Sequence, residues 1–485
     1  MARIAIVGAG FSGTLLALHL LRRCPPGSKI TLIERGVQFG RGAAYSTGNP
    51  SHLLNVPAGK MSAFHDRPHD FVEWLQAQAD PPVTGPVTDG SFVPRQVFGN
   101  YVRHLLNQEI KTPSQSADLE LLRGDAERIE HDGDQVVLHL DRRRTLRADI
   151  AVLAVGNFPP ESPALADPSF YDTDFYRADP WGADTFTELD PQSPVLMIGT
   201  GLTMVDAVVS LLDQGHTGPI HALSRRGLCP QRHVPGGRTP TPRADSFPTD
   251  LVGLTAFMRR EGRRAALENA DWRATVDELR PFTGDVWAEM SMQDKARFLR
   301  HLRPWWEIHR HRMAAPVADR IDAAIGRGQL TLYGGRIRSF DVQGDRVTLS
   351  YRVRGTNDVR QITAARVVNC SGPGADYARI SHPLIRSLLG SGMVRPDPLC
   401  LGLDVTRNCA LKDTKGAISG RLFAVGPVTK AAFWEMTAVP DIRRQCEYLA
   451  NHLSVLARAV RPRGEAVPRA TEILAAVRNE PPAAP

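Results

Sequence analysis

Near its start the chain reads Ile4-Ala5-Ile6-Val7-Gly8-Ala9-Gly10-Phe11-Ser12-Gly13, a short apolar run followed by a glycine-rich turn. The apolar run is typical of a buried parallel strand, and residues 14–21 carry the apolar spacing of a helix. Between such a strand and helix, Gly8 permits a tight turn, Gly10 lets the backbone approach a pyrophosphate, and Gly13 lets the helix pack closely on the strand. The pattern predicts a dinucleotide-binding turn, and the alternative is a glycine turn used only for packing.

A second glycine-rich turn, Gly199-Thr200-Gly201-Leu202-Thr203-Met204, lies far along the chain. It follows an apolar run at 194–198 and precedes a helical pattern at 204–212. The first two glycines, which the turn and the phosphate need most, are present, whereas Met204 replaces the third glycine of the fingerprint. Two such units predict two dinucleotides bound to one protein.

The residues after the next strand distinguish the two units. In the first unit, the strand expected at 29–33 ends in Glu34, where an acidic side chain accepts hydrogen bonds from a ribose. In the second unit, the strand at 220–223 runs into Arg225 and Arg226, and an arginine there can pair with a 2′-phosphate. This difference favours NADPH over NADH at the second turn. The alternative for both arginines is a solvated loop.

Composition excludes several other classes of protein. With 485 residues, 42% hydrophobic and 23% charged, the chain is expected to be a soluble globular protein of two or three domains. The formal net charge is +7, but the basic residues are spread along the whole chain, so we expect no nucleic-acid partner. No apolar stretch is long enough to span a bilayer and no signal segment precedes the first strand, so we expect a cytoplasmic protein without a membrane partner.

The cysteines and histidines indicate no metal site. The six cysteines contain no Cys-x-x-Cys motif and no closely spaced pair, which argues against a disulfide scaffold, a zinc site and a dithiol redox centre. His309 and His311 have no third ligand at a suitable spacing, so we predict no bound metal.

The order of the expected elements predicts an α/β fold with two Rossmann-like domains and a helical segment. A repeated pattern supports this interpretation, because a hairpin-like stretch leads to a buried strand and a glycine at 135–156 and again at 346–372. We interpret residues 1–190 and 335–467 as two parts of one nucleotide-binding domain and residues 191–334 as an inserted domain with a helical extension. Residues 468–485 are predicted to be a flexible tail.

Further stretches carry a resemblance to a known family. They are Gly40-Arg41-Gly42-Ala43-Ala44-Tyr45-Ser46, His52-Leu53-Leu54-Asn55-Val56-Pro57-Ala58-Gly59-Lys60-Met61-Ser62, Phe92-Val93-Pro94-Arg95, Arg303-Pro304-Trp305-Trp306, Gly426-Pro427-Val428-Thr429 and Phe433-Trp434-Glu435. With these stretches the chain resembles the two-dinucleotide flavoproteins that include flavin-containing and N-hydroxylating monooxygenases, and most of all bacterial FAD/NAD(P)-binding oxidoreductases. The resemblance covers almost the whole chain. It implies FAD in the discontinuous domain and NADPH in the inserted one.

The resemblance also implies site residues. Segment 53–62 is expected to run along the flavin, and the catalytic candidates are Asn55, Lys60, Met61 and Trp434. For Lys60 the alternative is a surface lysine, and for Met61 it is packing. The predicted cofactor-binding residues are Gly8, Gly10, Phe11, Ser12, Gly13, Glu34, Arg35, Arg41, Asn55, Met61, Ser62, Arg95, Gly156, Gly199, Gly201, Leu202, Thr203, Arg225, Arg226, Gly372, Gly426, Pro427 and Val428.

A helix is expected over 303–313, and helical spacing would place Trp305, His309 and Arg312 on one face. That face either closes over a substrate or NADPH, or serves only for helix packing.

The implied function is an NADPH-dependent FAD monooxygenase that oxygenates a nitrogen or another soft heteroatom of a small metabolite through a C4a-hydroperoxyflavin, with oxygen as co-substrate. The first alternative is an FAD-dependent NAD(P)H oxidoreductase that passes electrons to an acceptor without inserting oxygen. The second is a non-catalytic flavin-binding protein, against which the intact second glycine turn argues. One fold serves many reactions, so the resemblance does not identify the substrate.

Overall fold

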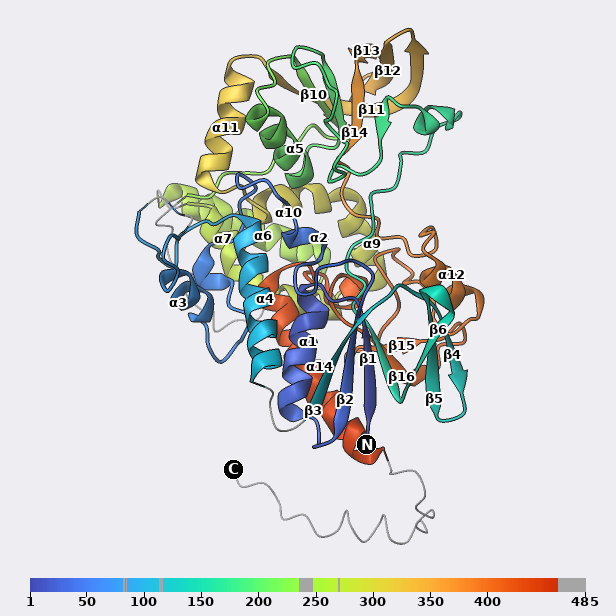
Figure 1. The fold of residues 1–485 in the computed structure, drawn as a ribbon. Helices are drawn as coiled ribbons and strands as arrows, with labels where there is room; N and C mark the ends of the chain where they lie inside the picture. The colour runs from blue at the N-terminus through green and yellow to red at the C-terminus, as the bar shows by residue number, and fades with distance from the viewer. Residues whose placement is uncertain (82, 84, 113–116, 235–246, 269–270, 461–485) are drawn as a thin grey trace.

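A six-stranded sheet forms the first unit of the computed structural model, which describes residues 1–81, 83, 85–112, 117–234, 247–268 and 271–460 (Figure 1). Its strand order is β15 (Ala410–Lys412), β16 (Ile418–Ala424), β7 (Ile150–Leu153), β1 (Arg3–Val7), β2 (Ser28–Glu34) and β3 (Ala117–Arg123). Neighbouring strands are parallel except β15 and β16. The apolar run at 4–7 is therefore a central strand, covered on both faces as parallel sheets require.

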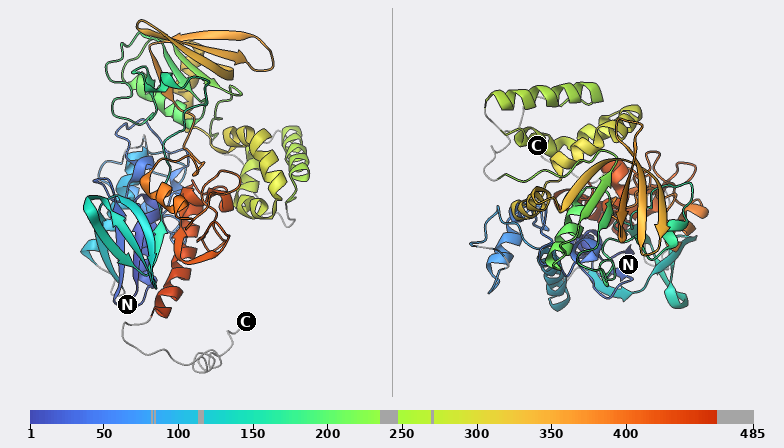
Figure 2. Two further views of the ribbon diagram at one scale, coloured as in Figure 1. Left: turned by 90° about the vertical axis from the view of Figure 1, so that its right-hand side faces the viewer. Right: turned by 90° about the horizontal axis from the view of Figure 1, so that it is seen from above.

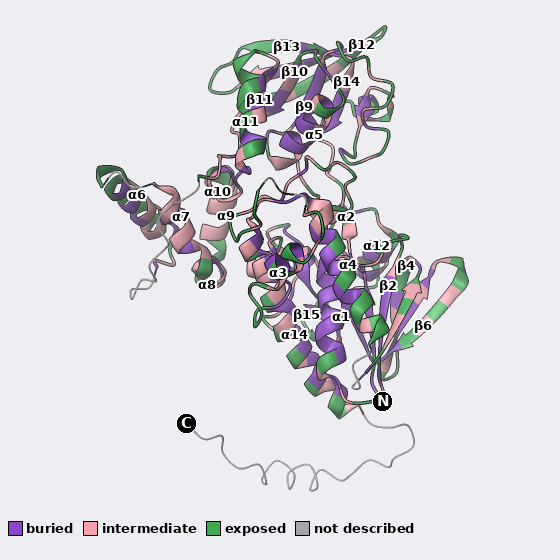
Figure 3. Ribbon diagram, turned by 60° about the vertical axis from the view of Figure 1, so that its left-hand side comes forward, coloured by how far each residue is buried: buried purple, intermediate pink, exposed green. Residues whose placement is uncertain are grey.

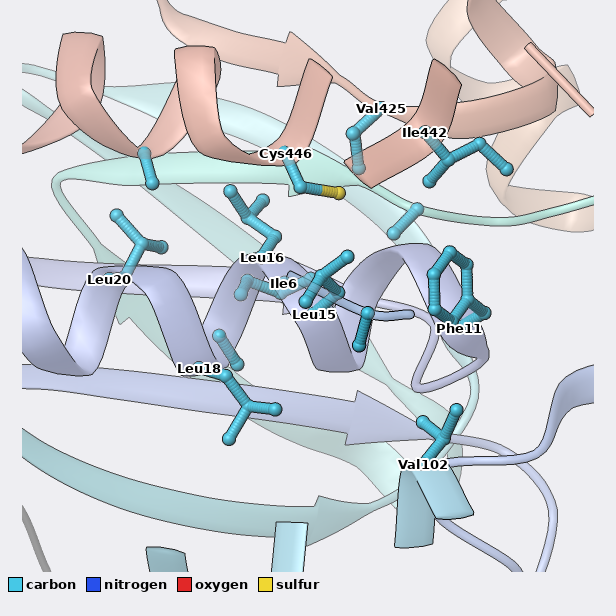
Figure 4. Packing of buried hydrophobic residues seen from close by; sticks show 14 of the residues in the cluster. Ile6, Phe11, Leu15, Leu16, Leu18, Leu20, Val102, Val425, Ile442 and Cys446 are labelled. Atoms are coloured by element: carbon cyan, nitrogen blue, oxygen red, sulfur yellow. The ribbon is translucent and has the colours of Figure 1, made fainter. Parts of the chain in front are cut away.

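Helices cover one face of this sheet. They are α1 (Phe11–Arg23), α4 (Arg95–Lys111) and α14 (Val439–Ala459), and α1 lies between the other two. Figure 4 shows Leu15 and Leu16 of α1 packed near Cys446 and Ile442 of α14. The chain thus joins its first helix to its last described one in a single apolar core.

The other face of the first sheet packs on a small antiparallel sheet and a helix. The strands are β4 (Ala126–Asp132), β5 (Gln135–Leu140) and β6 (Arg144–Ala148), and the helix is α12 (Pro383–Gly390). Shorter helices lie in the connections, namely α2 (Gly42–Tyr45), α3 (Asp70–Gln76) and α13 (Lys430–Phe433).

A seven-stranded sheet forms the second unit. Its order is β13 (Val359–Ala364), β12 (Arg346–Val353), β11 (Leu330–Gln343), β10 (Ile220–Ser224), β9 (Val195–Ile198), β14 (Arg366–Asn369) and β8 (Tyr176–Arg177). The helices α5 (Leu202–Asp213) and α11 (Ala315–Gly326) pack against it. Two Rossmann-like units are therefore present, which confirms the predicted fold class.

The sheets correct the predicted boundaries. The repeated pattern is real, but each antiparallel meander returns to its own sheet: β7 pairs with β1, and β14 pairs with β9. Residues 335–369, predicted to lie in the first domain, therefore belong to the second sheet, as does β8, which precedes the predicted start at 191. The reason is that Arg366–Asn369 pairs in parallel with Val195–Ile198, which is a strand of the second unit.

A helical lobe projects to one side of both units (Figure 2). It consists of α6 (Leu251–Leu267), α7 (Arg273–Leu279), α8 (Thr283–Glu289), α9 (Met292–His301) and α10 (Arg303–Arg310). The lobe interrupts the connection between β10 and α11, and Figure 3 shows that most of its surface is exposed or half-buried. The predicted tail at 468–485 lies outside the described residues. Within the described part of the chain, no helix combines the length and apolarity that crossing a membrane requires.

Candidate dinucleotide sites and their junction

The first glycine turn has the geometry that its sequence predicts. Gly8 has φ +105°, and a Cβ on it would lie 2.4 Å from the carbonyl oxygen of Ala154 at the end of β7. A Cβ on Gly13 would lie 1.9 Å from the carbonyl oxygen of Gly8. These two glycines are therefore required for the close approach of α1 to β1 and β7. The first turn of α1 carries no acidic side chain, so its N-terminus favours an anion.

Three other segments meet at this turn. A Cβ on Gly42 would lie 2.9 Å from Cα of Gly10, and one on Gly426 would lie 2.5 Å from Oγ of Ser12. The Gly426 amide donates to Oε1 of Gln445 on α14 at 2.8 Å. The structure thus brings Gly10, Ser12 and Gly426 together, as the resemblance implies, and leaves a cradle of glycines at a helix N-terminus that fits a pyrophosphate.

Glu34 lies beside the same turn. Its carboxylate accepts hydrogen bonds from the backbone amides of Ala9 and Gly36, both at 2.9 Å. These bonds fix the carboxylate at the carboxyl end of β2, where a ribose hydroxyl would reach its remaining lone pairs. Arg35 is exposed next to it, and the Arg41 guanidinium donates to Gln38 and Asn100.

The predicted flavin segment contributes several residues to the core, while its other residues are half-buried or exposed. Met61 and Ser62 are 2% and 0% exposed, and Ser62 Oγ donates to the carbonyl oxygen of Arg67 at 2.6 Å. This burial favours packing for Met61. Lys60 is exposed, whereas Asn55 is half-buried and its carbonyl oxygen lies 3.0 Å from Nε2 of His233.

Trp434 packs against the helical lobe. Its ring stacks on Trp287 of the lobe with centroids 4.6 Å apart, and the edge of Phe298 contacts it at 5.1 Å. Trp306 Nε1 donates to Oε1 of the neighbouring Glu435 at 3.1 Å. The Trp434 side chain therefore anchors the lobe on the first unit. Lys430 Nζ lies 5.1 Å from the centroid of the same ring, and burial lowers the pKa of that lysine to about 8.

The second glycine turn repeats the first. Gly199 has φ +111°, and a Cβ on it would lie 2.3 Å from the carbonyl oxygen of Cys370 at the end of β14. Gly201 has no described atom within 4 Å of a Cβ, while Met204 fills the core position of the missing third glycine. Gly156 and Gly372 follow β7 and β14 with φ +68° and +91°. Gly372 therefore adjoins the second turn, not the first.

The two predicted phosphate-binding arginines differ in their surroundings. Arg225 is exposed, and Arg226 is half-buried with Nη2 donating to the carbonyl oxygen of His301 at 3.0 Å. Arg225 is thus the better placed of the two arginines to pair with an anionic ligand. Arg226 also connects the second unit to the lobe.

The predicted face on α10 is present only in part: His309 and Arg312 both contact the Trp272 ring, but Arg312 is not on the helix. The helix ends at Arg310, so Arg312 lies beyond it, where it is buried and paired with Asp277 at 3.0 Å. His309 Nδ1 lies 2.7 Å from the carbonyl oxygen of Trp305, and Trp305 is an exposed residue. The helix-packing interpretation therefore accounts for this stretch. No group of three or more possible metal ligands occurs among the described side chains.

Sequence reasoning missed the junction between the units. Arg95, predicted to contact a cofactor, forms an ion pair with Asp206 of α5 at 2.8 Å, and His52 Nε2 lies 3.0 Å from the carbonyl oxygen of Asp206. A signal was available, because Asp206 is the one charged residue in the apolar run 204–212 and a buried charge requires a partner. A cavity of about 760 Å³ at Leu212, His216 and Arg327 lies at the opposite end of α5 from the turn.

Comparisons with known proteins agree with this architecture. Residues 5–158 match the model of an FAD-NAD(P)-binding family, while a search of curated proteins found no match. The structure is similar to the ornithine hydroxylase of Pseudomonas aeruginosa, with 14% identity and a TM-score of 0.60 over 94% of this chain and 99% of that one. It is also similar to the L-lysine 6-monooxygenase of Pseudomonas syringae, with 14% identity and a TM-score of 0.60 over 95% and 100%.

A third similar structure is the cadaverine monooxygenase of Erwinia amylovora, solved with FAD, with 12% identity and a TM-score of 0.60 over 96% of this chain and 97% of that one. At identities this low, the structural similarity establishes the fold but does not identify the substrate. The two sheets, the paired glycine turns and these structural similarities agree on one architecture, and the chain has the fold of the two-dinucleotide flavoproteins.

Proposed function

We propose that this chain is an FAD- and NADPH-dependent monooxygenase that oxygenates a nitrogen or another soft heteroatom of a small metabolite. The observation that carries the proposal is the junction, where the helix after the second glycine turn contacts Asn49, His52 and Arg95 of the first unit. Two dinucleotides bound at the two turns would therefore extend toward one shared region. The similarity to ornithine, lysine and cadaverine oxygenating enzymes supports an amine as the first substrate class to test.

The protein residues would bind and orient the cofactors. FAD would lie in the first unit, with its pyrophosphate at the backbone amides after Gly10 and a ribose at Glu34. NADPH would lie in the second unit, with its pyrophosphate at Gly201 and its 2′-phosphate at Arg225. FAD bound there would supply the redox chemistry between NADPH and dioxygen, with dioxygen as the source of the transferred oxygen atom.

The test measures whether an oxygen atom of dioxygen enters an organic product. FAD-loaded protein is incubated with NADPH, ¹⁸O₂ and, in turn, L-ornithine, L-lysine, cadaverine and an uncharged thioether, and products are analysed by mass spectrometry together with hydrogen peroxide. One ¹⁸O atom in a product, at one per NADPH consumed, supports the proposal. NADPH oxidation that yields only peroxide, combined with fast electron transfer to an added quinone, would instead establish the oxidoreductase alternative.

A further inference from the structure

Several contacts between the two units lie on one flank of α5. The side chains of Arg95 and Asp206 are 16% and 7% exposed, and their atoms Nη1 and Oδ2 are 2.8 Å apart. An ion pair this well buried is expected to hold its geometry, since separating it would leave a charge without compensation in a poorly solvated place.

Neighbouring groups contact both partners of the pair. His52 Nε2 lies 3.0 Å from the carbonyl oxygen of Asp206 and 2.9 Å from Oγ of Ser210, and its Nδ1 lies 2.7 Å from Oγ1 of Thr47. Burial lowers the pKa of His52, which keeps the ring neutral. Trp181 lies against two of these side chains, 5.6 Å from the His52 ring and 5.8 Å from the Arg95 guanidinium.

Arg95 also touches the segment expected along the flavin. It is the first residue of α4, and its Nε donates to the carbonyl oxygen of Leu53 at 3.2 Å. Asp206 lies in the second turn of α5, five residues after the N-cap Gly201. One guanidinium therefore connects the start of segment 53–62 to the helix whose N-terminus would hold the pyrophosphate of NADPH.

We propose that Arg95 and Asp206 are positioning residues for hydride transfer, because their ion pair sets the distance between the second glycine turn and the flavin segment. The step is NADPH + FAD + H⁺ → NADP⁺ + FADH₂, in which the hydride leaves the nicotinamide for the flavin and solvent supplies the proton. The inference rests on the two-cofactor part of the proposed function and is independent of what the reduced flavin does next.

The experiment measures anaerobic reduction of bound FAD by NADPH in a stopped-flow spectrophotometer, at several NADPH concentrations. The variant Arg95→Met/Asp206→Asn removes both charges, so that neither is left buried alone. We expect the limiting reduction rate to fall about tenfold or more, with the dissociation constant of NADPH changed by less than about twofold. Arg95→Lys, which keeps the charge, should restore part of the rate.

The matched control is Arg23→Met/Glu447→Gln, which removes an ion pair between α1 and α14 inside the first unit. It should reduce at the wild-type rate. A wild-type rate in the Arg95/Asp206 double variant would overturn the inference, and so would loss of FAD from that variant, because the pair would then serve FAD binding. A wild-type protein whose FAD is not reduced by NADPH would contradict the proposed function itself.

Discussion

Gly201 differs from the other turn glycines in its surroundings. A Cβ on Gly13 would meet backbone at 1.9 Å, whereas one on Gly201 meets no described atom within 4 Å, and its φ of −86° suits any residue. The free protein should therefore accept Gly201→Ala with a change in unfolding free energy within about 1 kcal/mol. A bound pyrophosphate would collide with the new methyl group, so NADPH affinity should fall about tenfold or more.

Titration calorimetry with NADPH and chemical unfolding check this prediction. Gly262→Ala, in open space on α6, is the control and should leave NADPH affinity unchanged. Unchanged NADPH affinity in Gly201→Ala would mean that the second turn does not hold the pyrophosphate.

Arg225 and Arg226, which follow β10, allow a second prediction about single side chains. Arg225→Ala should weaken NADPH binding about tenfold and leave NADH binding unchanged, since only NADPH carries the 2′-phosphate. Arg226→Ala should have the smaller effect on cofactor choice, because its guanidinium already donates to His301. The measurement is the ratio of NADPH to NADH dissociation constants in both variants, and an equal loss of both cofactors would contradict the assignment.

At the scale of elements, an aromatic stack contributes to the docking of the lobe on the first unit. Trp287 is 3% exposed, stacks on Trp434, and donates from Nε1 to the carbonyl oxygen of Ala431 at 2.7 Å. Trp287→Ala should weaken docking of the lobe by about 3–5 kcal/mol. Amide hydrogen exchange should then rise in α8 and α9 and stay unchanged in β1 and β7. Trp305→Ala, on a side chain 40% exposed, should change neither region, and a global loss of protection would contradict a local anchor.

The sequence predicts elements better than their assembly. Strand, glycine turn and helix are local, so the residues around Gly8 and Gly199 are enough to identify both units. Sheet membership is not local: the run at 366–369 is typical of a buried strand, but nothing in its composition says which sheet it joins. The same holds for Arg95, because the partner of a basic residue in a motif is fixed by tertiary packing, here by Asp206 of the other unit.

For the whole molecule, two histidines with lowered pKa values predict sensitivity to acid. Burial, with Arg23 and Arg22 nearby, lowers the pKa of His19 to about 3, and burial lowers that of His311 to about 4. A folded-state pKa below the ordinary value of 6.5 means that the stabilisation is complete above pH 6.5 and is lost progressively as the pH falls toward the folded-state pKa. His19 alone should therefore lower the unfolding free energy by about 2 kcal/mol between pH 7 and pH 5.

The variant His19→Gln isolates this contribution from that of the carboxylates, which titrate in both proteins. A glutamine can still accept the hydrogen bond that Arg23 Nη1 directs at His19 Nδ1 over 2.9 Å, yet it does not titrate. Guanidinium unfolding at pH 7 and pH 5 should show a loss of stability smaller than that of the wild type by about 2 kcal/mol. His65→Gln, at an exposed position, should keep the wild-type difference. If His19→Gln lost as much unfolding free energy between pH 7 and pH 5 as the wild type, the acid sensitivity would come from other groups. The imidazole of His19 would then bind its proton in the folded protein.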